Sequence, residues 1–542
     1  MTERTVAEAL ADAFAAKGVK YIFGVPGGGS SLDIIEAAAK RNIEFVLTRT
    51  ESAAVMMAAA SAELDGTLGV ALMTKGPGSA NATNGIAYAS LERLPIIVLT
   101  DGFTPKEQTY ITHQVFDQKA MLQPLTKGHS RLEGSSAAQD IKTNVDLAMT
   151  SPCGPIHFEL TSAAARAKIS PEIADKDSDL QTPSRLTVDE TALSKANALL
   201  AKAERPVVIV GMEAREPSAA KATRTLVKML NCPALTTYKA KGVISDQDPY
   251  FAGIFTGGTK EADCVNKADL IILSGIDPVE FIRQPWRYEA PVIDISDVKH
   301  PVHYLTPDAG LYGSISEHIA GLSGASESTL WTEKEIAELR QDMHGRLQCE
   351  SGAGINPQQV VESAFEEARS LETTPRITVD AGAHMFSAME FWPCTAPCDV
   401  LISNGLATMA FALPAAIAAA LHEPERSVIA FTGDGGLLMC LGELLTAVQC
   451  DTNITIVVFN DASLSLIDIK QQERQLPSRG MRWSRPDFSK MMEGMGGHGY
   501  NVETIQEYEQ ALAEALHVRG PALIDVAVDA SGYSDQLKAM RG

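Results

Sequence analysis

Residues 427–461 read SVIAFTGDGGLLMCLGELLTAVQCDTNITIVVFND, and this stretch predicts a strand, a glycine turn, a helix and a second strand in succession. The apolar run 427–432 has the length of a buried strand and leads into the Gly-Asp-Gly-Gly turn at 433–436. Apolar residues then recur at helical spacing through 437–450, and 454–459 is again apolar. The stretch therefore predicts one strand–helix–strand unit of a parallel sheet.

The strand ends of this unit indicate a site for a metal-bound diphosphate. Glycine N–H groups at a helix N-terminus can bind phosphate oxygens, because the peptide dipoles favour an anion there. Asp434 and Asp461 follow the two strands, so their carboxylates would meet at one edge of the sheet and could bind Mg²⁺. The alternative is an ordinary unit with acidic surface turns, since a glycine turn alone is weakly specific.

The spacing resembles the thiamine-diphosphate signature, in which Gly-Asp-Gly is followed further along by Asn-Asn. The second Asn of that pattern is Asp461 here, which leaves open whether Asn460 or Asp461 binds the metal. The resemblance implies thiamine diphosphate and Mg²⁺ as cofactors, with Asp434, Asp461 and the backbone carbonyl of Ser463 as metal ligands. It also implies that the following residues contact the cofactor: Gly433, Gly435, Gly436, Leu437, Leu464 and Leu466.

The N-terminal third contains a second match, in YIFGVPGGGSSLDIIEA (21–37) and TRTESAAVMMAAASAELDG (48–66). These stretches resemble the pyrimidine-binding domain of the acetolactate synthase and 2-oxo acid decarboxylase superfamily. The resemblance implies that Glu51 hydrogen-bonds N1′ of the cofactor's aminopyrimidine ring. The alternative for an isolated Glu would be a helix N-terminal acid favoured by the helix dipole.

Two stretches of the C-terminal third extend the resemblance. NGLATMAFALPAAIAAAL (404–421) is similar to the segment beneath the thiazolium ring, which implies that Met409 supports the bent cofactor and that the carbonyl of Ala407 faces the 4′-amino group. Without the family, the same stretch predicts a small-residue helix packed in a core. VDAGAHMFSAMEFW (379–392) places His384 where the family contacts diphosphate, although the flanking glutamines of acetolactate synthases are replaced here.

Six residues are expected near the reacting carbon: Gly28, Lys75, His113, Gln114, Leu466 and Ile467. Lys75 replaces a small polar residue of the family's loop and could bind a substrate carboxylate, or it could be a solvated lysine. His113 could relay a proton or be structural. Leu466 and Ile467 make the pocket apolar where pyruvate decarboxylases place an acid, which argues against acetaldehyde production by their route.

Composition excludes several classes of function. The 542 residues, 45% of them hydrophobic, suffice for about three domains. The eight cysteines are scattered and the amino terminus lacks a signal pattern, so we expect a cytoplasmic protein with reduced thiols. No apolar run reaches membrane-spanning length. A net charge of −22 disfavours nucleic acid as a partner.

Alternating strands and helices predict an α/β protein with three doubly wound parallel-sheet domains. We expect an N-terminal pyrimidine-binding domain at 1–168, a central domain at 190–322 and a C-terminal diphosphate- and Mg-binding domain at 356–535. The polar stretch 169–190 reads as a linker, and 331–348 as a solvated helix that bridges domains. The first and third domains look like distant repeats.

The family resemblance also bears on the central domain and on assembly. Some relatives bind FAD in the central domain, but the turn after 207–210 has only Gly211 where a dinucleotide turn has several glycines, so FAD is predicted to be absent. The resemblance implies active sites at a subunit interface, and therefore self-association as a homodimer or homotetramer.

The sequence thus predicts a 2-oxo acid decarboxylase that can also ligate, dependent on thiamine diphosphate and Mg²⁺. The cofactor would supply a nucleophilic carbon that also accepts an electron pair. The alternatives are an acetolactate synthase-like carboligase, disfavoured by the weak FAD turn, and a lyase of 2-hydroxy ketones or 2-hydroxyacyl thioesters. A catalytically silent homologue is disfavoured because both Glu51 and Asp434 are present.

Overall fold

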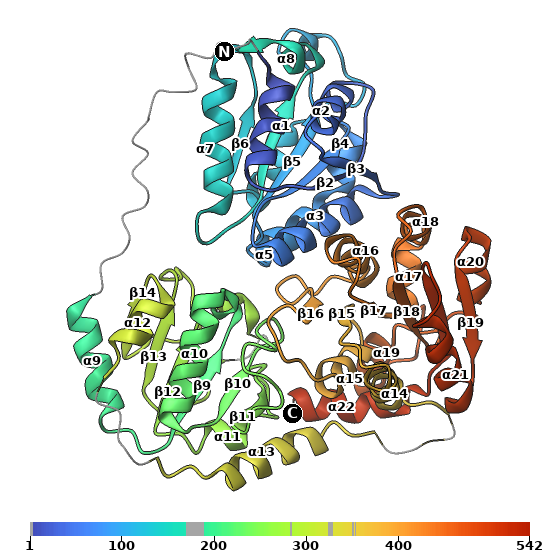
Figure 1. The fold of residues 1–542 in the computed structure, drawn as a ribbon. Helices are drawn as coiled ribbons and strands as arrows, with labels where there is room; N and C mark the ends of the chain where they lie inside the picture. Colours follow the sequence, from blue (N-terminus) through green and yellow to red (C-terminus); the bar gives the residue numbers. More distant parts are fainter. Residues whose placement is uncertain are drawn as a thin grey trace.

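A computed structural model describes residues 4–169, 189–281, 285–323, 329–349, 352 and 354–541 of the chain. It contains three domains, each built on a six-stranded sheet in which every neighbouring pair of strands is parallel (Figure 1). Their strands are rich in Val and Ile and are mostly buried, as expected for parallel sheets covered by helices on both faces. The predicted fold class is therefore confirmed.

The N-terminal domain has the sheet order β3-β2-β4-β5-β7-β6. Its strands are β2 (Tyr21–Val25), β3 (Glu44–Leu47), β4 (Gly69–Met73), β5 (Ile96–Asp101), β6 (Gly128–Arg131) and β7 (Ile156–Leu160), and a short antiparallel pair joins β1 (Arg4–Thr5) to β8 (Lys168–Ile169). Its helices are α1 (Val6–Ala16), α2 (Ser30–Ala39), α3 (Glu51–Asp65), α4 (Pro77–Asn81), α5 (Thr83–Leu91), α6 (Gln118–Leu122), α7 (Ala137–Met149) and α8 (Ser162–Arg166).

The C-terminal domain has the order β16-β15-β17-β18-β20-β19. Its strands are β15 (Arg376–Val379), β16 (Val400–Ile402), β17 (Val428–Gly433), β18 (Ile454–Asn460), β19 (His498–Val502) and β20 (Ala522–Ala527). Its helices are α14 (Pro357–Ser370), α15 (His384–Phe391), α16 (Ala412–His422), α17 (Asp434–Cys440), α18 (Glu443–Gln449), α19 (Ser465–Glu473), α20 (Phe488–Met495), α21 (Ile505–Ala515) and α22 (Tyr533–Arg541). Numbered from its own first main-sheet strand, each of these two domains has the order 2-1-3-4-6-5, which confirms the predicted repeat.

The central domain is different, with the order β11-β10-β9-β12-β13-β14, or 3-2-1-4-5-6 by the same numbering. Its strands are β9 (Pro206–Val210), β10 (Ala234–Thr236), β11 (Phe251–Ile254), β12 (Leu270–Ser274), β13 (Val292–Ser296) and β14 (Ala309–Tyr312). Its helices are α9 (Glu190–Leu200), α10 (Pro217–Leu230), α11 (Ala262–Val265) and α12 (Ile315–Gly321), and α13 (Glu333–Gly345) follows. This is the strand order of dinucleotide-binding folds.

Three predicted segments differ in detail from the structure. The helix expected over 437–450 is broken at 441–442 into α17 and α18. Glu443, the first residue of α18, accepts hydrogen bonds from the Arg49 and Thr50 amides, the latter at 2.9 Å. The helix expected in 404–421 begins only at Ala412. Helix α13 is not merely solvated, since Ile336, Leu339 and Met343 are buried and α13 packs on β11. Most of the predicted linker lies outside the described residues.

The N-terminal and C-terminal domains meet along α3 and α16 (Figure 1). Both helices are rich in alanine, and their small side chains share one buried apolar cluster. Small residues allow two helices to approach closely. Glu51 begins α3, and the segment with Ala407 and Met409 leads into α16. The packing therefore ties the helix that carries Glu51 to the helix that follows the 407–409 segment of the same chain.

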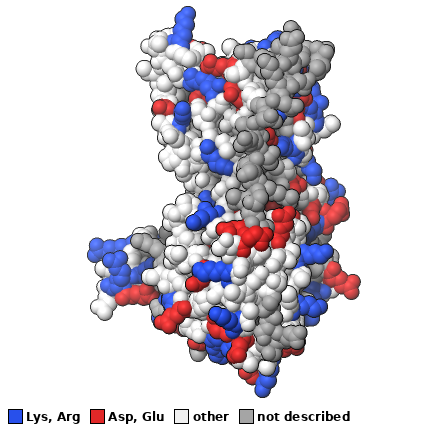
Figure 2. Space-filling view, turned by 90° about the vertical axis from the view of Figure 1, so that its left-hand side faces the viewer, with Lys and Arg blue, Asp and Glu red and all other residues white. Residues whose placement is uncertain are grey.

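In the described part of the chain, the surface charge, the cysteines and the helix lengths show no feature that sets this protein apart. On the face seen in Figure 2, basic and acidic side chains are interspersed. All eight cysteines are free thiols. Among the described helices, none combines the length and apolar character needed to cross a membrane.

A pair of histidines, His157 buried and His129 half-buried, predicts how stability depends on pH. His129 Nδ1 and His157 Nδ1 lie 2.9 Å apart, and His157 Nε2 lies 2.8 Å from Thr100 Oγ1. Burial lowers the pKa of His157 to about 3 and that of His129 to about 4. The unfolded chain then binds more protons than the folded one below about pH 6.5, so stability should fall from there toward pH 4, by about 1.4 kcal/mol per pH unit for each fully buried histidine.

We expect His157→Leu to reduce this acid sensitivity while lowering stability at neutral pH. Thermal unfolding of both proteins between pH 7.5 and pH 4.5 checks it. Parallel curves for the two proteins over that range would contradict the assignment.

Candidate active site

Asp434 and Asp461 face each other at the carboxyl ends of β17 and β18, which are neighbours in the sheet. The Gly435 amide donates to Asp434 Oδ1 at 2.7 Å, whereas Asp434 Oδ2 is buried without a hydrogen-bond partner among the described residues. Burial, and then repulsion from Asp461, raise the pKa of Asp434 to about 7. Burial also raises the pKa of Asp461, which accepts a hydrogen bond from the Ser465 hydroxyl. A divalent cation would relieve this repulsion and use the orphaned oxygen.

The side chain of Asn460 points away from this pair. Its Nδ2 donates to Asp525 Oδ1 at 2.8 Å and to the Pro486 carbonyl at 3.1 Å. Asn460 is the last residue of β18 and Asp461 follows the strand, and successive residues at a strand end tend to point to opposite faces. The geometry favours Asp461 over Asn460 as the metal ligand, and Ser463 follows on the same loop.

His384 begins α15 beside the glycine turn. It is 3% exposed and stacks on Phe459 with ring centroids 5.1 Å apart. Burial lowers its pKa to about 4, only partly offset by a hydrogen bond to the backbone of Phe431. Its Nε2 has no hydrogen-bond partner in the described part of the chain. A neutral imidazole with a spare nitrogen is thus present where the family contacts diphosphate.

The glycines of the turn leave room that side chains would fill. A Cβ on Gly436 would lie 2.0 Å from Asp380 Oδ2, and one on Gly435 would lie 2.9 Å from the side chain of Leu464. Asp380 follows β15 and accepts hydrogen bonds from the amides of Phe411, at 2.8 Å, and Ala410, at 3.1 Å. Asp380 was not predicted as a site residue, because a single acid after a strand is not a distinctive signal.

The loop before α16 has an unusual backbone. Ala407 and Ala410 have φ angles of 52° and 66°, a region that residues with a side chain rarely adopt. Met409 lies next to the glycine turn, with its Cε 3.3 Å from the position of a Cβ on Gly435. Such strained residues cluster at functional sites when their surroundings fix them.

These elements surround a cavity of about 270 Å³. The predicted residues that line it are His384, Ala407, Met409, Gly433, Asp434, Gly435, Gly436, Asp461, Ser463, Leu464, Leu466 and Ile467. Leu437 does not line it, because its side chain is fully buried in the core. The end of the chain contributes Tyr533 and Arg541 of α22, which the sequence gave no reason to expect.

The predicted residues of the N-terminal domain lie at the carboxyl edge of their own sheet. Glu51 is 9% exposed and accepts a hydrogen bond from Asn81 Nδ2 at 2.5 Å. Lys75 lies over the ring of Phe103, 4.6 Å from its centroid, so it is not a freely solvated lysine. Gln114, with φ 60°, packs over Gly76, next to Lys75.

The remaining two of these residues, Gly28 and His113, are exposed. Asp101 organises this edge. Its carboxylate accepts the Ser30 hydroxyl at 2.6 Å and the Ser31 amide at 3.1 Å, and it was also missed. Among the described residues that line the 270 Å³ cavity, none belongs to the N-terminal domain.

Comparison with known proteins agrees with the division of the chain into three domains. Three family models match, described as thiamine pyrophosphate enzyme N-terminal TPP binding domain (4–121), central domain (193–322) and C-terminal TPP binding domain (380–526). The chain belongs to the thiamine-pyrophosphate-dependent enzyme superfamily. The three matches fall on the three sheets described above.

Relatives of this superfamily cover almost the whole chain. It is 29% identical to an acetolactate synthase of Bacillus subtilis (strain 168), over 98% of this chain and 94% of that one. It is 28% identical to a probable acetolactate synthase large subunit of Methanocaldococcus jannaschii, over 96% and 92%. It is also 28% identical to a catabolic acetolactate synthase of Raoultella terrigena, over 96% and 95%. These relatives favour the carboligase alternative over the simple decarboxylase.

Adding one methyl group to the glycine turn is expected to lower both stability and cofactor affinity. Gly436→Ala places Cβ against Asp380, so we expect a loss of about 1–3 kcal/mol of stability and much weaker binding of thiamine diphosphate. The matched control is Gly494→Ala at an exposed position of α20, where nothing lies within 4 Å of the added Cβ. Calorimetric titration of both variants checks this, and equal affinity in the two would contradict it.

The facing carboxylates predict opposite effects with and without metal. Asp434→Asn removes one charge of a buried like-charged pair, so the metal-free variant should be more stable than the wild type, by at least about 1 kcal/mol. The rise in Tm that Mg²⁺ and thiamine diphosphate give the wild type should disappear. A variant that keeps this rise would move the metal site elsewhere.

Proposed function

We propose that this protein is a thiamine-diphosphate- and Mg²⁺-dependent carboligase that decarboxylates a 2-oxo acid and joins the remaining acyl group to a second carbonyl compound, as an acetolactate synthase does. The residues around the cavity support the cofactors. Asp434 and Asp461 with the Ser463 carbonyl would hold Mg²⁺, and the glycine amides with His384 would contact diphosphate.

The proposal that the enzyme ligates rests on the composition of the cavity wall around Met409. Leu464, Leu466 and Ile467 form this wall, and the described residues that line the cavity include no carboxylate besides Asp434 and Asp461. When bound, thiamine diphosphate would supply a nucleophilic carbon that also accepts an electron pair, the chemistry that loss of carbon dioxide from a 2-oxo acid needs. No acid among the described residues of this wall could then deliver a proton to the substrate carbon, which would leave a second carbonyl compound to react with it.

The chain's own residues would position the reactants. Glu51 would share a proton with N1′ of the pyrimidine, and the Ala407 carbonyl would accept from the 4′-amino group. Lys75, held over Phe103, would bind the substrate carboxylate. Gln114 lies beside the Lys75 loop and His113 is exposed next to it, so both could contact the second carbonyl compound.

One half of this site would come from one subunit and the other half from a second subunit. Glu51 and Lys75 lie on the N-terminal domain, whereas the cavity is lined by the C-terminal domain of the same chain. The exposed apolar side chains of Leu438 and Met439, 42% and 58% exposed, lie on α17 next to the metal site. They support burial of this surface by a second copy, as a dimer or as part of a tetramer.

We also propose that the central domain binds no FAD, although its strand order suits a dinucleotide. The amide after the Gly211 turn, that of Met212, donates to Glu280 Oε2 at 2.9 Å, and the Asp277 amide donates to the same oxygen at 3.2 Å. A Cβ on Gly211 would lie 2.6 Å from that oxygen. The chain's own carboxylate thus takes the place where a dinucleotide fold binds phosphate.

Product identification tests the proposal. Carbon dioxide release from a panel of 2-oxo acids, with thiamine diphosphate and Mg²⁺ added, should be accompanied by a 2-hydroxy-2-acyl acid or an acyloin. Asp434→Asn serves as the inactive control. An aldehyde as sole product would contradict ligation and support a simple decarboxylase. No release from any acid, with cofactor bound, would redirect the search to lyases of 2-hydroxy ketones or 2-hydroxyacyl thioesters.

A further inference from the structure

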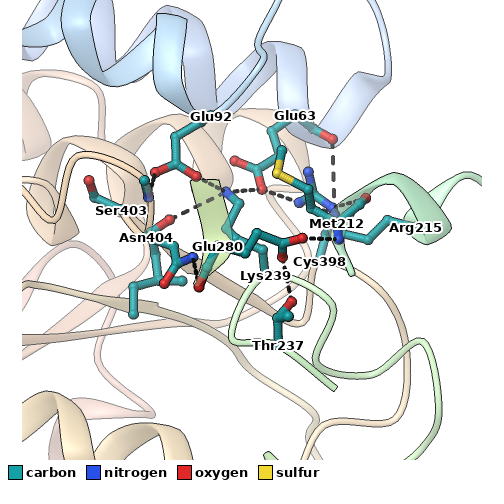
Figure 3. A network of polar contacts seen from close by, with 12 residues as sticks. Glu63, Glu92, Met212, Arg215, Thr237, Lys239, Glu280, Cys398, Ser403 and Asn404 are labelled. Carbon is teal, nitrogen blue, oxygen red and sulfur yellow. Dashed lines mark hydrogen bonds and ion pairs between the residues drawn. The ribbon is translucent and has the colours of Figure 1, made fainter. Parts of the chain in front are cut away.

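The three domains meet at a buried network of charged side chains (Figure 3). Lys239 follows β10 of the central domain, and its ammonium group lies 2.5 Å from Glu63 Oε1 and 3.4 Å from Glu92 Oε2. The side chains of all three residues are 1% exposed. Glu63 lies in the last turns of α3, the helix that begins with Glu51, and Glu92 directly follows α5. Burying these charged groups costs desolvation energy, so the network is expected to have a role beyond stability.

Charges in the network are paired asymmetrically. Burial opposes ionisation of Glu63, but Lys239 and Arg215 more than offset it and hold its pKa below the usual value. Burial raises the pKa of Glu92, against the attraction of Lys239. Removing Lys239 would therefore leave Glu63 with one cation and Glu92 with none among the described residues.

The network continues into the backbone of the C-terminal domain. The Gly405 amide donates to Glu92 Oε1 at 2.7 Å, and the Lys239 ammonium donates to the Ile402 carbonyl at 3.3 Å. The Asn404 side chain donates to the Glu280 carbonyl at 3.4 Å. Three positions of the segment 402–405 are thus held by residues of the two other domains.

This segment leads directly into the strained loop of the active site. Ala407, in the left-handed region, comes two residues after Gly405, and Met409 follows. Beyond Met409, Asp380 accepts the amides of Ala410 and Phe411. The loop is therefore held at both ends, by Asp380 on one side and by Lys239 with Glu92 on the other.

We infer that Lys239 and Glu92 are positioning residues for the cofactor. They act through the backbone of 402–405 and hold the Ala407 carbonyl and Met409 in the arrangement that receives the aminopyrimidine and thiazolium rings. Neither residue lines the cavity. The central domain then contributes to cofactor binding without touching the cofactor, and the inference rests on the proposed thiamine diphosphate site.

The chain offers a matched control for Lys239. Lys241 lies two residues further on, is 2% exposed and pairs with Asp246, which accepts the Cys394 amide at 3.0 Å. Lys241→Met therefore also breaks a buried ion pair, one within the central domain whose Asp246 contacts the C-terminal domain at Cys394, outside 402–411. Both Lys239→Met and Lys241→Met should lower Tm, because each leaves a buried carboxylate uncompensated.

Only Lys239→Met should affect the loop. In the full chain without cofactor, we expect amide hydrogen exchange of 402–411 to accelerate in Lys239→Met and to stay at the wild-type rate in Lys241→Met. The Kd for thiamine diphosphate, measured with saturating Mg²⁺ by quenching of tryptophan fluorescence, should rise about tenfold in Lys239→Met alone. Trp483 can report binding, since its ring lies 3.5 Å from the position of a Cβ on Gly435.

A second pair of variants separates the hydrogen bond from the charge. Glu92→Gln keeps an oxygen that accepts the Gly405 amide and should bind cofactor with nearly wild-type Kd. Glu92→Leu removes the acceptor and should behave as Lys239→Met does. This pair keeps the test informative if Lys239→Met fails to fold.

Three results would overturn the inference: unchanged exchange over 402–411 in Lys239→Met, equal effects of Lys239→Met and Lys241→Met on Kd, or equal Kd values for Glu92→Gln and Glu92→Leu. Failure of the proposed function looks different. In that case the wild type itself would bind no thiamine diphosphate, while hydrogen exchange would still report whether Lys239 fixes the loop.

Discussion

Two like charges held side by side govern the architecture of the C-terminal domain. Asp434 and Asp461 lie at neighbouring strand ends, partly or wholly cut off from water, and each raises the free energy of the other's ionised form. A cation between them would relieve this repulsion. The glycines at 433–436 then have to stay small, because Asp380 fills the space behind Gly436 while it anchors the loop that leads to α16.

The N-terminal half of the predicted site lies on a second sheet of the same topology. The N-terminal domain has the same strand order, and Asp101 fixes its edge much as Asp380 fixes the other. One edge presents Glu51 and Lys75, and the other presents Asp434 and Asp461. Among the described residues, the 270 Å³ cavity beside the two aspartates is lined by the C-terminal domain alone. The central domain joins the two through Lys239, which contacts α3 through Glu63 and the cofactor loop through Ile402.

Local patterns predicted the strands, the glycine turn and the acids that follow it, because each of these depends on residues near in sequence. The features that the sequence did not predict depend on residues that are distant in the sequence. The helix break at 441–442 comes just before Glu443, which bonds the distant Arg49 and Thr50 amides. Lys239 contacts the Ile402 carbonyl, 163 residues away along the chain, and the sequence around Lys239 carries no sign of this role. The φ angle of Ala407 was equally unpredictable, since alanine normally avoids it.

The central claim is that each active site combines the N-terminal domain of one subunit with the C-terminal domain of another. Glu51→Gln and Asp434→Asn each inactivate one half, so each purified variant should be inactive. When the two are unfolded together and reassembled as mixed dimers, one site in each mixed dimer should have both halves intact, which restores about a quarter of wild-type activity. No recovery, with mixed dimers demonstrated, would place both halves in one chain and contradict the account.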